Sequence, residues 1–152
     1  MKKIVKLVVL LLIVVSCNSN EKEDKTNKVK YPKKTSIKQV SPELKASIIE
    51  GKLVYENLCI TCHMADGKGV TKAFPPLANS DYLKKKQTAS IKAVKNGMSG
   101  EITVNGITYN SVMAPLGLSD EEVADVVNYI NNSWGNNYGK MLTAEQVGKI
   151  AK

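Results

Sequence analysis

The stretch Cys59-Ile60-Thr61-Cys62-His63 decides how the rest of the chain is interpreted. Its two cysteines are three positions apart, so in a helix their thiols lie on one face, about one turn apart. His63 follows directly and is the only histidine in the 152-residue chain. Three other uses of this pattern fit less well. A thioredoxin-like dithiol needs a strand-helix setting that is absent here, a structural zinc site needs a fourth ligand, and a disulfide leaves His63 without a role.

The same spacing is the attachment motif of a c-type haem. The two thiols add to the two vinyl groups of haem, and the adjacent histidine is then placed under the iron as its proximal ligand. The sequence therefore predicts one covalently bound haem c, attached through Cys59 and Cys62 and ligated by His63. The chain has one phenylalanine and one tryptophan beside six tyrosines, so its supply of aromatic core residues is small, which agrees weakly with a bound cofactor.

The N-terminus has the pattern of an export signal. Lysines precede an apolar run over residues 7–15, which is too short to cross a bilayer, since that takes about 20 residues. The run ends in Val14-Val15-Ser16-Cys17, which resembles a bacterial lipobox and so implies cleavage before Cys17 and lipidation of that residue. An ordinary signal peptide with an incidental cysteine is the alternative. We expect residues 1–16 to be a lipoprotein signal peptide and the protein to be exported and membrane-anchored, facing the periplasm or the cell exterior.

Residues 17–40 are polar and of mixed charge, which predicts a flexible linker between the lipid and the folded part. The whole chain carries a net charge of +8, but residues 48–152 hold eleven lysines and ten acidic residues. The basic excess therefore lies toward the N-terminus. There is no arginine to make bidentate contacts with phosphate or guanine, so we expect no nucleic-acid binding.

The rest of the chain contains start and stop signals for four helices and one hairpin. The expected class is all-α with a minor β-hairpin, arranged as a domain over residues 41–137 and a short C-terminal helix within residues 138–152. The helices are expected from Ser41-Pro42-Glu43 to Leu58, from residue 88 or 89 to Asn96, after the capping box Ser119–Glu122, and after the capping box Thr143–Gln146; the hairpin pairs residues 102–104 with 107–109 around Asn105-Gly106.

From residue 51 to residue 134 the chain resembles a class I cytochrome c. Gly51 and Tyr55 stand where that family packs its first helix against its last, and the last helix here carries Tyr129 and Ile130. The resemblance implies a cytochrome c-like helical domain built around a covalently bound haem.

The resemblance also assigns residues beside the haem. Asp66-Gly67-Lys68-Gly69 looks like the glycine-containing turn that follows the family's histidine, and Pro75-Pro76-Leu77 looks like its Pro-x-Leu element. In the family, the proline carbonyl accepts a hydrogen bond from the second nitrogen of the proximal imidazole and so fixes the ring. Here that proline is Pro75, and Leu77 is expected to lie against the haem.

The second axial ligand has few candidates. A single histidine excludes bis-histidine ligation, which leaves methionine, lysine or an open position. Met64 is confined to the proximal side and Met141 lies beyond the last core helix. Met113 lies in an irregular stretch where the family carries its distal methionine, although Ala114 separates it from the proline that often follows directly. Met113 is the predicted ligand and Met98 the lesser alternative, while the simplest other role for either is to fill the core.

The predicted function is that of a membrane-tethered mono-haem c-type cytochrome, an electron-transfer protein and not an enzyme, which shuttles single electrons between respiratory redox partners. The resemblance narrows to cytochrome c domains of quinoprotein dehydrogenases or copper nitrite reductases, which implies an oxidase, a nitrite reductase or a dehydrogenase as partner. The alternative is a haem enzyme or gas-binding sensor in which Met113 is labile.

Overall fold

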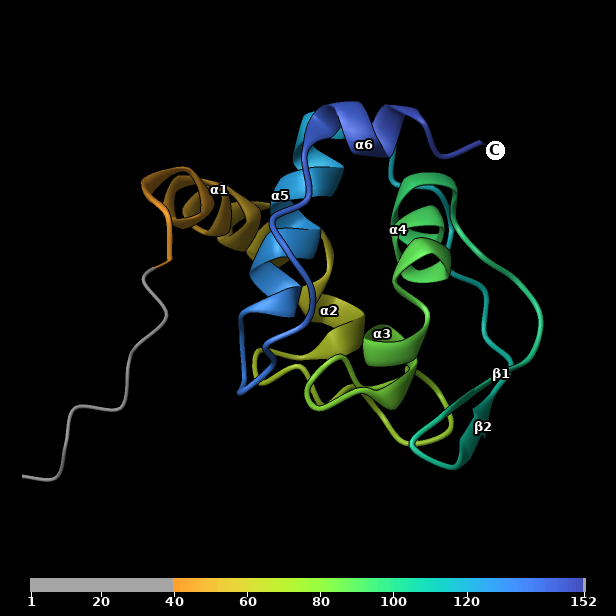
Figure 1. Ribbon diagram of the computed structural model, residues 1–152. Coiled ribbons are helices and arrows are strands. Elements are labelled where there is room, and N and C mark those ends of the chain that lie inside the picture. The colour runs from red at the N-terminus through yellow and green to blue at the C-terminus, as the bar shows by residue number, and fades with distance from the viewer. Residues whose placement is uncertain (1–39, 152) are drawn as a thin grey trace, which may run out of the picture. The chain divides into compact units, whose positions relative to one another are not determined.

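The computed structural model describes residues 40–151. The predicted signal peptide, residues 1–16, lies outside this part. So does the predicted linker, including the lipidation site Cys17, except for its last residue. None of the helices described is long and apolar enough to cross a membrane. The described residues form six helices and one two-stranded antiparallel sheet: α1 (Pro42–Leu58), α2 (Ile60–His63), α3 (Asp81–Lys85), α4 (Gln87–Asn96), β1 (Ile102–Val104), β2 (Ile107–Tyr109), α5 (Asp120–Asn131) and α6 (Ala144–Gly148) (Figure 1).

The helix starts predicted from capping residues are confirmed. Ser41 accepts a hydrogen bond from the backbone N–H of Leu44 at the start of α1, at 3.2 Å. At α5, the Ser119 side chain accepts from the Glu122 backbone while Glu122 accepts from the Ser119 backbone, so both halves of the capping box are formed. The same reciprocal pair begins α6. These contacts satisfy backbone N–H groups that have no partner within the helix.

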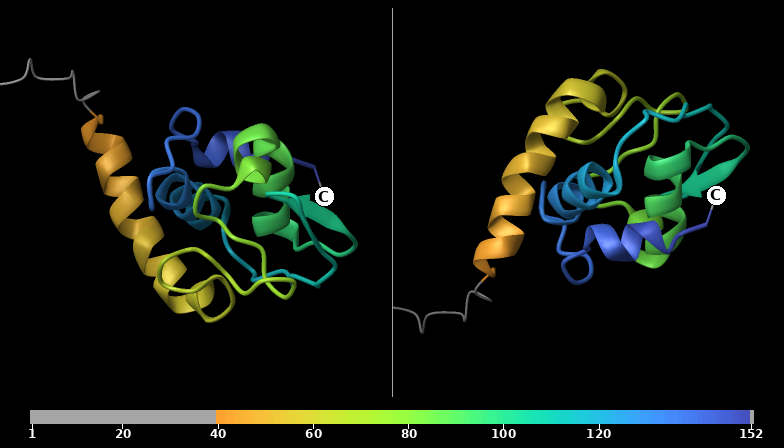
Figure 2. Two further views of the ribbon diagram at one scale, coloured as in Figure 1. Left: turned by 90° about the horizontal axis from the view of Figure 1, so that it is seen from below. Right: turned by 90° about the horizontal axis from the view of Figure 1, so that it is seen from above.

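The core of the domain is the crossing of α1 and α5, which make the most extensive contact between any two elements (Figure 2). The apolar stripe of α5, namely Val123, Val126, Val127 and Ile130, is buried as predicted. The two helices approach closely at Gly51, where an added Cβ would lie 1.9 Å from the carbonyl oxygen of Asp125. A side chain at position 51 would therefore force the helices apart.

An aromatic cluster lies near the C-terminal ends of α1 and α5. The rings of Tyr55, Tyr129 and Trp134 lie within 5.1–5.5 Å of one another, centroid to centroid, in tilted or edge-on arrangements. The Trp134 indole N–H donates to the carbonyl of Ala65, just after the Cys-x-x-Cys-His motif. The cluster therefore holds the motif against the α1–α5 core, which agrees with the packing role expected for Tyr55 and Tyr129.

The C-terminal helix packs on the same core. Val147 of α6 is fully buried, and its carbonyl accepts a hydrogen bond from the Lys95 ammonium of α4. That ammonium also pairs with Asp120 at the start of α5, at 2.9 Å. The ammonium of Lys95 thus joins α4 to the start of α5 and to α6, although the hairpin separates α4 from both in sequence.

Two short helices were not predicted. α2 is a single turn formed by the motif itself, and α3 has five residues and no apolar stripe. α3 is held by its N-cap Ser80 and by Asp81, whose carboxylate and backbone N–H both bond with Asn105 of the hairpin turn. Ser80 and Asp81 are a local N-terminal signal, but the contacts with Asn105 lie 24 positions away in sequence, and no apolar stripe accompanied the signal.

Candidate functional site

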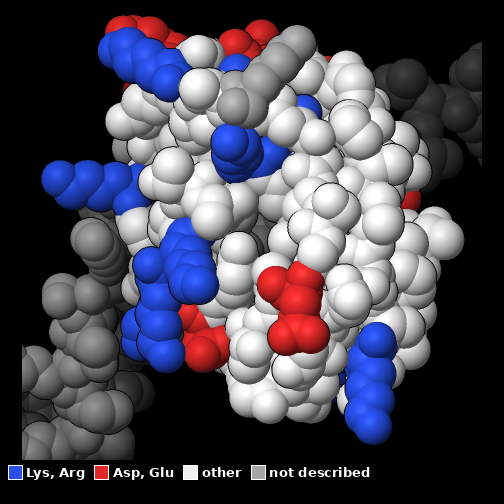
Figure 3. Space-filling view, turned by 90° about the vertical axis from the view of Figure 1, so that its right-hand side faces the viewer, with Lys and Arg blue, Asp and Glu red and all other residues white. Residues whose placement is uncertain are grey.

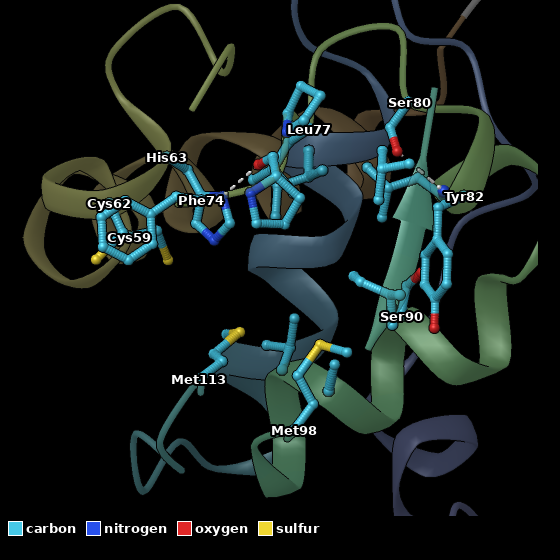
Figure 4. A pocket seen from close by; sticks show the side chains of 18 of the residues that line it. Cys59, Cys62, His63, Phe74, Leu77, Ser80, Tyr82, Ser90, Met98 and Met113 are labelled. Atoms are coloured by element: carbon cyan, nitrogen blue, oxygen red, sulfur yellow. Dashed lines mark hydrogen bonds between the residues drawn. The ribbon is translucent and has the colours of Figure 1, made fainter. Parts of the chain in front are cut away.

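The Cys-x-x-Cys-His motif is folded as a single helical turn at the end of α1. The Cys59 carbonyl accepts from the backbone N–H groups of Cys62 and His63, at 3.2 and 2.9 Å. This turn directs all three side chains into one pocket (Figure 4). Both cysteines are free thiols, and burial, with a smaller contribution from Cys62, raises the pKa of Cys59 to about 11. The two thiols therefore lie together and unpaired at one end of the pocket, as thioether attachment requires.

The imidazole of His63 has one nitrogen committed and one free. Nδ1 lies 3.0 Å from the carbonyl oxygen of Pro75. A carbonyl can only accept, so Nδ1 carries the proton and Nε2 keeps its lone pair. Burial lowers the pKa of His63, against the opposing effect of the Pro75 hydrogen bond, and this favours the neutral, ligating form.

The Pro75 carbonyl is positioned by the loop that follows the motif. The backbone of Gly69 donates to the His63 carbonyl at 3.0 Å, and Val70 pairs with Phe74 through two backbone hydrogen bonds. The backbone N–H of Leu77 then donates to the Gly67 carbonyl at 2.7 Å, and its side chain lines the pocket. Backbone hydrogen bonds therefore join the turn and the Pro-x-Leu element into one loop, which holds the Pro75 carbonyl against the imidazole of His63.

Two methionines stand on the far side of the pocket from His63. Met98 and Met113 both line it, and their backbones form an isolated antiparallel bridge (Figure 4). Met64 and Met141 do not line the pocket, and Met64 is 38 % exposed. The structure thus brings Met113 and the alternative Met98 to the same wall and leaves the other two methionines of the described part away from it.

The pocket is wide and almost entirely apolar. It encloses about 1120 Å³ of space between protein atoms, some of it open to solvent. Its walls come from α3, α4, the hairpin and α5, and include Leu83, Val94, Val104, Val126 and Ile130. Free thiols at one end, a free imidazole nitrogen on one wall and thioethers on the other fit a covalently attached haem.

The walls from α3 and α4 contain site residues that sequence reasoning missed. Tyr82, Gln87 and Ser90 line the pocket, and Gln87 also hydrogen-bonds the side chain of Asn131 on α5. The serine at the α3 N-cap was a signal for the first of these segments, but nothing local indicated that it faces the motif.

Comparison with known proteins decides the family. The family model described as cytochrome c matches residues 48–134. The chain belongs to the cytochrome c family. Cytochromes c are electron-transfer proteins that carry covalently attached haem c, so this chain binds haem c, transfers electrons and is not itself an enzyme.

Its relatives include carriers and subunits of larger complexes. The chain is 37 % identical over 110 residues to cytochrome c-552 of Thermus thermophilus, a match that covers 66 % of this chain and 83 % of that protein. It is 35 % identical over 103 residues to the cytochrome c subunit of the quinone alcohol dehydrogenase of Gluconobacter oxydans, covering 66 % of this chain and 21 % of that subunit. It is 34 % identical over 107 residues to the cytochrome c subunit of gluconate 2-dehydrogenase of Pantoea cypripedii. That match covers 67 % of this chain and 24 % of that subunit. The predicted likeness to dehydrogenase cytochromes is confirmed, and the likeness to nitrite reductases stays a prediction.

Proposed function

We propose that this cytochrome c is a membrane-tethered carrier with one haem, which Cys59 and Cys62 would hold through two thioether bonds and whose iron His63 and Met113 would ligate. One observation carries the proposal. A histidine with its Nδ1 committed to Pro75 faces, across an apolar pocket, a loop that presents the Met113 thioether. Haem bound there supplies a one-electron iron couple.

The surroundings of the site favour the reduced state. A thioether is a soft ligand that suits ferrous iron, and an apolar pocket disfavours the extra positive charge of ferric iron. The Pro75 carbonyl orients the imidazole, and Leu77 adds an apolar side chain to the pocket lining. We therefore expect the reduction potential of the haem to be raised, as suits a carrier that delivers electrons to a terminal acceptor.

The proposed partners are redox proteins, namely an oxidase, a nitrite reductase or a quinoprotein dehydrogenase. The dehydrogenase subunits among its relatives support the last class. Figure 3 shows the face on which the hairpin and α4 lie: lysines stand mostly along one side of it, an acidic side chain lies near its centre, and much of the remaining surface is uncharged. Such a surface suits brief docking with modest electrostatic steering.

We also propose that Cys17 is lipidated and that residues 17–40 tether the cytochrome domain to the membrane outside the cytoplasm. The apolar run ending at Cys17 supports this. In Cys17→Ala, the cytochrome should move from the membrane fraction to the soluble exported fraction. Retention of the variant in the membrane would contradict lipid anchoring at this residue.

The haem site is tested on the purified mature protein. Mass spectrometry should find the polypeptide heavier by one haem that survives denaturation, and the oxidised protein should show a far-red sulfur-to-iron charge-transfer band. The reduced protein should bind carbon monoxide slowly, since a thioether must first leave. Rapid binding without the far-red band would instead favour a gas-binding or enzymatic haem.

A further inference from the structure

The strands that carry Met98 and Met113 are joined at these two residues. The Met98 N–H donates to the Met113 carbonyl at 2.8 Å, and the Met113 N–H donates to the Met98 carbonyl at 2.9 Å. They form an isolated bridge, separate from the β1–β2 pairs. The two methionines are therefore directly opposite each other in an antiparallel pair, although fourteen residues separate them in the chain.

This pairing fixes where their side chains point. Residues directly opposite in an antiparallel pair project to the same face, with Cβ atoms about 4.5–5.5 Å apart. Both thioethers accordingly project into the pocket from the same wall, facing the His63 side (Figure 4). A site that one sulfur reaches is therefore within a side-chain movement of the other, because methionine has three rotatable bonds.

The residue before Met98 makes this close approach possible. Gly97 has φ +75°, and a Cβ at this position would lie 2.6 Å from the Met113 carbonyl oxygen and 2.8 Å from the nitrogen of Pro115. A larger residue would push the two strands apart. The bridge is therefore a built feature of the loop that carries Met113.

Few other side chains of the described pocket could serve as a ligand. Cys59 and Cys62 are used in attachment and His63 holds the opposite side. The remaining groups with a ligating atom are hydroxyls, amides and the second thioether, and no lysine is among the residues that line the pocket. Of these, only the thioether of Met98 matches the soft, neutral character of Met113.

We propose that Met98 is a reserve axial ligand, whose sulfur binds the haem iron when Met113 is unable to. This inference rests on the proposed function, in which Met113 is the resting ligand. The backbone bridge keeps Met98 on the correct wall without Met113's side chain, because its hydrogen bonds involve main-chain atoms only.

The far-red sulfur-to-iron band of the oxidised protein tests this in four variants. Met113→Leu preserves side-chain volume and should retain a band, shifted in position, because Met98 replaces the lost sulfur. Met98→Leu should retain the band through Met113, and the double variant Met98→Leu/Met113→Leu should lose it. Met64→Leu/Met113→Leu is the matched control, since Met64 lies outside the pocket, and it should retain the band as Met113→Leu does.

The outcomes separate this inference from the proposed function. If the wild type shows the band and Met113→Leu loses it as completely as the double variant, Met98 is no reserve ligand while the carrier function stands. If Met98→Leu loses the band, Met98 is the resting ligand and the inference is overturned. A wild type without the band contradicts the methionine ligation on which both rest. Should Met113→Leu fail to fold, Met113→Ala gives the same comparison with a smaller side chain.

Discussion

At the scale of single residues, Tyr55 ties the haem motif to the core. The residue is 1 % exposed, and its hydroxyl donates to the carbonyl of Met64, directly after the motif, at 2.7 Å. Tyr55→Phe removes the donor and leaves that carbonyl without this partner, which should cost about 1 kcal/mol of unfolding free energy. Denaturant unfolding followed by circular dichroism measures the loss.

A second tyrosine provides the control. Tyr138 packs at the edge of the same core, and no hydrogen bond from its hydroxyl is found in the described part of the chain. Tyr138→Phe should therefore change the unfolding free energy by a few tenths of a kcal/mol at most, in the range of ordinary surface changes. Equal losses in the two variants would assign the effect of Tyr55→Phe to something other than its hydrogen bond.

Some residues of the candidate site could be predicted from the sequence and others could not. Cys59, Cys62 and His63 form a contiguous motif, so their shared direction follows from one helical turn. Pro75 was indicated by family resemblance, and its carbonyl lies at the expected nitrogen of His63. The bridge between Met98 and Met113 was not indicated, because it depends on a chain reversal between them that only the folded backbone shows.

At the scale of elements, the start of α5 depends on its N-cap. Ser119→Ala removes the acceptor for the Glu122 backbone N–H and should destabilise the protein by about 1 kcal/mol. The loss should appear in global unfolding, because α5 supplies more of the buried core than any other described element and packs on α1. Ser41→Ala at the exposed start of α1 is the matched variant, and its effect should be smaller because that end can fray alone.

The same capping box makes stability depend on pH. Hydrogen bonds from the Ser119 backbone and then its side chain hold the pKa of Glu122 below its ordinary value of 4.5. The unfolded state therefore binds the proton first as pH falls, so the contribution of Glu122 is complete above pH 4.5 and is lost below it. Glu122→Gln keeps an acceptor but cannot titrate. Wild type minus variant unfolding free energy should be constant above pH 4.5 and fall as the pH is lowered further; a flat difference across that range would exclude this mechanism.

Elements with local signals were the ones predicted from sequence. The capped helices and the Asn-Gly hairpin were found at or within two residues of their expected bounds, with α4 starting at Gln87. There the Gln87 side chain donates to the Leu83 carbonyl at 2.6 Å, a contact with no signature in the local pattern. α3 was missed because its support comes from Asn105 across the fold.

At the scale of the whole molecule, the arrangement of buried polar groups was also beyond the sequence. The Asn128 side chain donates to Ser47 of α1 and to the Leu142 carbonyl, and accepts from the Leu142 backbone. It is 1 % exposed and joins three segments. A polar residue within an apolar helix pattern gives no indication of which segments it joins, since those partners are set by tertiary packing.

The whole domain is organised around the pocket that the haem fills, so attachment and stability should be linked. In Cys59→Ala/Cys62→Ala both thioether bonds are impossible, and mass spectrometry after denaturation should find the polypeptide without haem. The pocket walls belong to the core, including Val126 and Ile130 of α5, so a poorly filled pocket removes packing from the main crossing. The unfolding free energy should fall by at least about 3–5 kcal/mol, the cost of deleting one large core side chain.

The two single-cysteine variants should have stabilities between those of the wild type and the double variant. Cys59→Ala and Cys62→Ala each retain one thiol, so each should keep a covalent haem and unfold between the wild type and the double variant. Loss of helical circular dichroism on heating orders all four proteins. A double variant that melts with the wild type would mean that the α1–α5 crossing is stable without a filled pocket. The fold would then form without the haem. The apolar walls that include Val126 and Ile130 argue instead that the haem completes the core.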